Sequence, residues 1–130
     1  MRSESRRDSR LFREVVRSLL KDGISLRFQA DGRSMHPAIG NAETIEVEPV
    51  AAVVPGDVVM AETADGIRVH RVVNTGNALA TRGDCCLDVD CDVRPLGVVS
   101  VVHDNEVRPV SRRSLGSVVR RWLARWRGRF

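Results

Sequence analysis

The sequence lacks any long hydrophobic run. Its longest apolar stretches have about five residues, as at Val50–Val54, whereas a helix that crosses a bilayer needs about 20. The first ten residues carry four arginines, and no apolar run follows them that could form the core of a signal peptide. We therefore expect a protein that is not integral to a membrane, with a cytoplasmic location.

Cysteine is also scarce. The three cysteines, Cys85, Cys86 and Cys91, lie within seven residues of one another. An odd number suits no disulfide framework and fits a reducing compartment. Because the Cys-x2-Cys spacing of zinc sites is missing, we expect free thiols in or beside a loop and no bound metal.

Lysine is almost absent, since Lys21 stands against twenty arginines. A mechanism that needs a lysine base therefore has one candidate. The net charge of +4 is unevenly distributed. Residues 112–130 hold seven arginines and no acid, so the first 111 residues carry 14 basic against 17 acidic groups, or −3. The basic character belongs to the C-terminal segment.

The hydrophobic pattern divides the 130 residues into three segments, with room for one modest core. Residues 1–23 form an N-terminal arm and an amphipathic helix, which the apolar spacing places at 9–21. Residues 24–110 hold valine-rich segments and turn signals that predict a mainly β domain. We expect a twisted, antiparallel, β-barrel-like core with an amphipathic helix at each end. The expected strands are 25–29, 44–50, 57–62, 67–74, 78–82, 97–103 and 106–110.

The second helix is expected at about 114–127, within the basic segment 111–130. Trp122 and Trp126 fall on its apolar face, with arginines between the apolar positions. Such a helix can dock on the β-domain or on a partner protein, or lie in a lipid headgroup layer as a peripheral anchor. Nucleic acid is not an expected partner, because no base-reading motif accompanies the arginines.

Three segments carry residues suited to nucleophilic catalysis. Ser34 lies in the loop Gly32–Pro37, His70 lies in the expected strand 67–74, and a loop rich in aspartate follows. A nucleophilic serine needs a nearby base, a backbone that presents its hydroxyl, and donors for the oxyanion. A strand histidine alone is more often structural, but a serine loop, a strand histidine and a Gly-Asp loop in this order favour a serine hydrolase.

These segments resemble the S24/S26 serine peptidase clan, which contains the type I signal peptidases and the LexA-like self-cleaving repressors. Gly-Arg-Ser-Met-His-Pro-Ala-Ile at 32–39 looks like the clan's nucleophile box. The resemblance covers about residues 25–103, and its boxes occur in the clan's order. The further similar segments are Pro55–Val59, Val69–Val73, Thr81–Asp84 and Leu96–Val99.

The resemblance implies a serine endopeptidase without a cofactor. Ser34 would be the nucleophile and His70 the general base, because the His-Arg-Val-Val context is that of the clan's histidine-using branch. The supporting carboxylates would be Asp84 and Asp90, with Asp88 also possible beside His70. The oxyanion hole would use backbone N–H groups of Ser34 and Gly32.

Two departures from typical signal peptidases shape the expected function. The helix at 9–21 is amphipathic where those enzymes have a transmembrane helix, and Gly32 lacks the hydroxyl that many of them place there. We therefore expect a small soluble or peripheral relative that matures a peptide or protein precursor rather than exported preproteins. The alternative is a non-catalytic peptide-binding module of the same fold, docked through its basic C-terminal helix.

Overall fold

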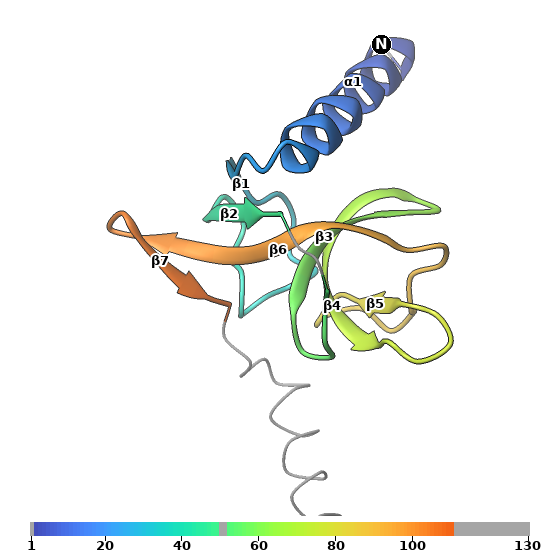
Figure 1. Cartoon of the computed structure of the whole chain (residues 1–130), viewed down its shortest axis with the longest axis vertical. Coiled ribbons are helices and arrows are strands. Elements are labelled where there is room, and N and C mark those ends of the chain that lie inside the picture. The colour runs from blue at the N-terminus through green and yellow to red at the C-terminus, as the bar shows by residue number, and fades with distance from the viewer. Residues whose placement is uncertain (1, 50–51, 111–130) are drawn as a thin grey trace, which may run out of the picture.

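The computed structural model describes residues 2–49 and 52–110, which form one helix and seven strands (Figure 1). The expected helix at the C-terminal end, with its proposed contacts, lies outside the described residues. The elements are α1 (Arg2–Lys21), β1 (Leu26–Gln29), β2 (Thr44–Glu48), β3 (Val58–Thr63), β4 (Gly66–Asn74), β5 (Ala80–Arg82), β6 (Arg94–His103) and β7 (Glu106–Pro109).

Helix α1 begins well before the predicted start at residue 9. The preceding residues are polar and include neither proline nor glycine, so they extend the helix without adding to the apolar pattern that the prediction relied on. Val16 and Leu20 are buried, whereas Figure 1 shows the N-terminal half projecting away from the sheet. Within the described residues, no helix combines the length and apolar character required to span a membrane.

The seven strands form one antiparallel sheet in the order β1-β2-β6-β3-β4-β5, with β7 paired to β6 as a hairpin. The prediction of a mainly β, antiparallel core is confirmed. The path of described strands is open, because β1 pairs only with β2 and β5 only with β4. The expectation of a barrel is therefore wrong in its closure. Strands of four and three residues at the two ends are too short to supply the continuous pairing that a barrel needs.

The sheet is open but not flat. Strand β3 is buried on both of its faces. Val58 and Met60 belong to the main core with α1, whereas Val59 and Ala61 belong to a second cluster with Val72. Register shifts interrupt the pairing of β3 with β6 and of β4 with β5, and such irregularities bend strands locally. The β1–β2 loop, strand β4 and the loop after β5 meet at one place, because Ser34 contacts both His70 and Cys85.

Candidate active site

Ser34 lies in the loop that joins β1 to β2. The buried side chains of Met35 and Ile39 anchor this loop in the main core. Backbone hydrogen bonds between Ala30 and Glu43 (2.8 Å) and between Ala42 and Ala30 (2.7 Å) close its base. Ser34 is thus held half-buried next to a core residue, rather than carried on a free loop.

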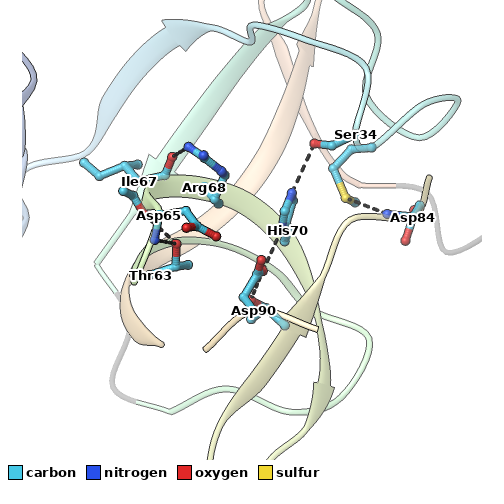
Figure 2. Close-up of polar contacts among 11 residues, drawn as sticks. Ser34, Thr63, Asp65, Ile67, Arg68, His70, Asp84 and Asp90 are labelled. Carbon is cyan, nitrogen blue, oxygen red and sulfur yellow. Dashed lines mark hydrogen bonds and ion pairs between the residues drawn. The ribbon is translucent and has the colours of Figure 1, made fainter. Parts of the chain in front are cut away.

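His70 lies on β4 and is buried, with 5% of its surface exposed. Its Nε2 atom lies 3.2 Å from Ser34 Oγ (Figure 2). The backbone around His70 is fixed because β4 pairs with β3, where Val59 is its cross-strand partner. The structure therefore brings together the serine and the histidine that the sequence singled out, 36 residues apart in the chain.

Asp90 lies on the far side of the imidazole. Its Oδ2 atom is 2.6 Å from His70 Nδ1, and Thr81 Oγ1 donates a hydrogen bond of 2.6 Å to the same oxygen. A carboxylate at Nδ1 favours the tautomer that carries its proton there and leaves the Nε2 lone pair free to accept the serine proton. Ser34, His70 and Asp90 thus have the connectivity of a serine hydrolase triad.

Asp84 has a different partner. Its two carboxylate oxygens accept hydrogen bonds from Arg71 Nε and Nη2, each at 2.9 Å. Arg71 Nη1 also donates to the carbonyl oxygen of Gly56 at 2.9 Å. Of the candidate carboxylates, the structure places Asp90 on His70 and Asp84 on Arg71, while Asp88 is exposed.

The loop after β5 packs directly on the serine loop, and Gly83 permits this contact. A Cβ atom at position 83 would lie 2.8 Å from the carbonyl oxygen of Ser34, 3.0 Å from His70 Nε2 and 2.6 Å from Cys86 Sγ. The next residue but one, Cys85, donates its N–H to the carbonyl oxygen of Ser34 at 2.8 Å. A glycine is required here by the close approach rather than by an unusual φ.

The two backbone N–H groups predicted for the oxyanion hole differ in their surroundings. The N–H of Gly32 donates to Asn41 Oδ1 at 3.0 Å. This N–H therefore stabilises the loop and is already engaged in a hydrogen bond. Among the described residues, no group accepts a hydrogen bond from the N–H of Ser34. The structure therefore leaves the Ser34 N–H as the candidate donor of this pair.

A cavity of about 610 Å³ adjoins Ser34 and His70. Sequence reasoning missed several of its walls, namely Phe12 of α1, Phe28 of β1 and Cys86. Phe12 and Phe28 meet edge to face with ring centres 5.4 Å apart. Phe12 does fall on the apolar face of its helix, but no sequence pattern says which strand that face meets. The cavity is bounded mainly by apolar side chains, which suits an apolar part of a ligand.

The described residues contain no cluster of three or more His, Cys, Asp or Glu side chains that could hold a metal ion. The three cysteines lie in the loop after β5 and form no disulfide with one another in the described residues.

Comparisons of the chain with family models, with curated proteins and with solved structures gave no match.

Proposed function

We propose that this protein is a serine endopeptidase of the signal-peptidase-like type, with Ser34 as nucleophile, His70 as general base and Asp90 as the carboxylate that orients the imidazole. The observation that carries the proposal is the unbroken line of contacts from Ser34 Oγ through His70 to Asp90 Oδ2, at 3.2 and 2.6 Å. At its Ser34 end, this line of contacts adjoins an apolar cavity, where a substrate side chain can bind.

The reaction follows from this geometry. Ser34 Oγ attacks the carbonyl carbon of the scissile peptide bond while its proton moves to His70 Nε2, and the N–H of Ser34 donates to the developing oxyanion. Collapse of the tetrahedral intermediate breaks the C–N bond, and His70 gives the proton to the leaving amine. Water then attacks the ester on Ser34 with His70 again as base, which releases the acid and restores the serine hydroxyl.

Two strand edges that have no partner among residues 2–49 and 52–110 favour an extended peptide as the substrate. In this described part of the chain, strand β1 pairs on one side only, and the pairing of β4 with β5 begins at Arg71, so the segment Gly66–His70 is paired only to β3. Residues of both segments line the cavity. Free strand edges bind extended peptides through main-chain hydrogen bonds, so we propose a peptide or protein precursor as the substrate.

The order of the sequence boxes supports the same function, because the segments that resemble the clan's boxes supply Ser34, His70 and the loop that carries Asp84 and Asp90. We place the activity in the cytoplasm. The basic segment 111–130 would contact either an anionic membrane surface or a partner protein, and co-sedimentation with anionic vesicles at low and high salt separates these two contacts.

An active-site-directed serine probe and a peptide library test the proposal. The wild-type protein should take up the probe and cleave some library peptides, detected by mass spectrometry, whereas Ser34→Ala should do neither. Ser25→Ala, which alters an exposed serine before β1, is the matched control and should behave like the wild type. Peptides that bind without cleavage by the wild type would instead support the non-catalytic peptide-binding module.

A further inference from the structure

Thr81 on β5 is completely buried, yet it carries a hydroxyl. Burying a hydroxyl is costly unless it makes a hydrogen bond. The single proton of this hydroxyl is donated to Asp90 Oδ2 at 2.6 Å, and that oxygen also contacts His70 Nδ1 at 2.6 Å. Since a valine side chain has nearly the same shape, filling space does not account for a threonine at this position.

A second contact fixes Thr81 and Asp90 relative to each other, because the N–H of Asp90 donates to the carbonyl oxygen of Thr81 at 2.8 Å. Thr81 is in turn the cross-strand partner of Val72 on β4, two residues from His70. The backbone of the sheet therefore holds Thr81 at a set distance from the imidazole. Asp90 follows an exposed stretch of loop. Its two hydrogen bonds with Thr81 therefore fix its position.

We propose that Thr81 is a positioning residue that holds Asp90 Oδ2 against His70 Nδ1. This inference rests on the proposed function and adds to it a residue for which the sequence predicted no role. Thr81 acts through Asp90, because its hydroxyl contacts that carboxylate and not Ser34. By donating to Asp90 Oδ2, the hydroxyl orients that oxygen toward the imidazole. Small misplacements of a catalytic group can cost about a hundredfold in rate.

Two substitutions separate the hydroxyl of Thr81 from its volume. Thr81→Val keeps the volume and removes the hydroxyl, whereas Thr81→Ser keeps the hydroxyl and removes a methyl group. With a cleaved library peptide as substrate, we expect Thr81→Val to lower kcat by about 10- to 100-fold with little change in KM. Thr81→Ser should restore kcat to near the wild-type value, even if urea denaturation shows it to be the less stable protein. Wild-type kcat in Thr81→Val would overturn the proposal.

A spectroscopic measurement tests the same contact without a substrate. The proton shared by His70 Nδ1 and Asp90 should give a low-field ¹H NMR resonance that is absent from His70→Ala and Asp90→Asn. We expect Thr81→Ser to keep this resonance and Thr81→Val to move it upfield or lose it to exchange with water. An unchanged resonance in Thr81→Val would contradict the inference. If the wild type cleaves no peptide, the proposed function fails, but the resonance still decides the role of Thr81.

Discussion

Two aspartates of one loop, Asp84 and Asp90, meet side chains at adjacent positions of β4. Asp84 pairs with Arg71 at 2.9 Å, and Asp90 contacts His70 at 2.6 Å. Adjacent residues of a strand point to opposite faces of the sheet, so the loop delivers one carboxylate to each face. All four side chains are largely buried, which makes the two contacts comparable in setting.

The difference between the two pairs lies in the chemistry of the side chain that β4 contributes. A guanidinium stays protonated at any pH that a protein meets, and its planar fork binds both oxygens of Asp84. An imidazole can accept and release a proton at its second nitrogen, which here contacts Ser34. The Arg71–Asp84 pair can therefore only hold structure, whereas the His70–Asp90 pair can also move a proton.

The largest expected effect is the loss of cleavage in Ser34→Ala and in His70→Ala. Each should lower kcat by roughly 10⁴- to 10⁶-fold, and the double variant should lose little more, because members of one catalytic unit are not additive. Strong cleavage by His70→Ala would show that another group is the base.

Asp90→Asn should have the next largest effect on activity. An amide in place of the carboxylate can donate to Nδ1, which favours the imidazole tautomer that cannot accept the serine proton, and we expect a fall in kcat of about 10³- to 10⁴-fold. The side chains have the same shape, so the urea midpoint should change little. Equal loss of activity and of stability would assign Asp90 the structural role that we give to Asp84.

Asp84→Ala should show the opposite pattern, with a large effect on stability. It leaves the Arg71 guanidinium buried without its carboxylate, and breaking a buried pair in this way costs about 3–5 kcal/mol of the free energy of unfolding. Urea denaturation measures this change, and Asp88→Ala, in an exposed part of the same loop, is the control that should unfold like the wild type. An Asp84→Ala protein of normal stability would contradict the structural role of this pair.

The same comparison shows what the sequence could predict. Valine-rich segments and turn signals located all seven strands to within a few residues, because strand propensity and turn chemistry are local properties. Ser34 and His70 were singled out because each lies in a segment with a distinctive local pattern, and the structure brings the two side chains within 3.2 Å of each other. Local pattern could not choose between Asp84 and Asp90, since the loop from 84 to 92 holds four aspartates without periodicity.

The missed residues depend on contacts that are distant in the sequence. Thr81 stands in the Thr-Arg-Gly-Asp segment that the sequence singled out, but its role follows from the pairing of β5 with β4. Phe12 reaches the cavity because α1 packs near β1. The open path of the described sheet likewise depends on which short strands pair with each other. The alternation of residues along a strand does not encode this pairing.

The smallest expected effects concern Lys21 and His103, two further groups that could be considered as bases. Lys21 is exposed in the last turn of α1, and His103 is exposed at the end of β6, where its Nε2 lies 2.9 Å from Glu43 Oε1. An exposed ion pair contributes at most about 1 kcal/mol. Lys21→Ala and His103→Ala should therefore retain kcat within about twofold of the wild type, with urea midpoints nearly unchanged. Cleavage that depends on Lys21 and survives His70→Ala would show that a lysine is the base. The Asp90–His70 contact, and the hydrogen bond of Thr81 that supports it, would then have no role in catalysis.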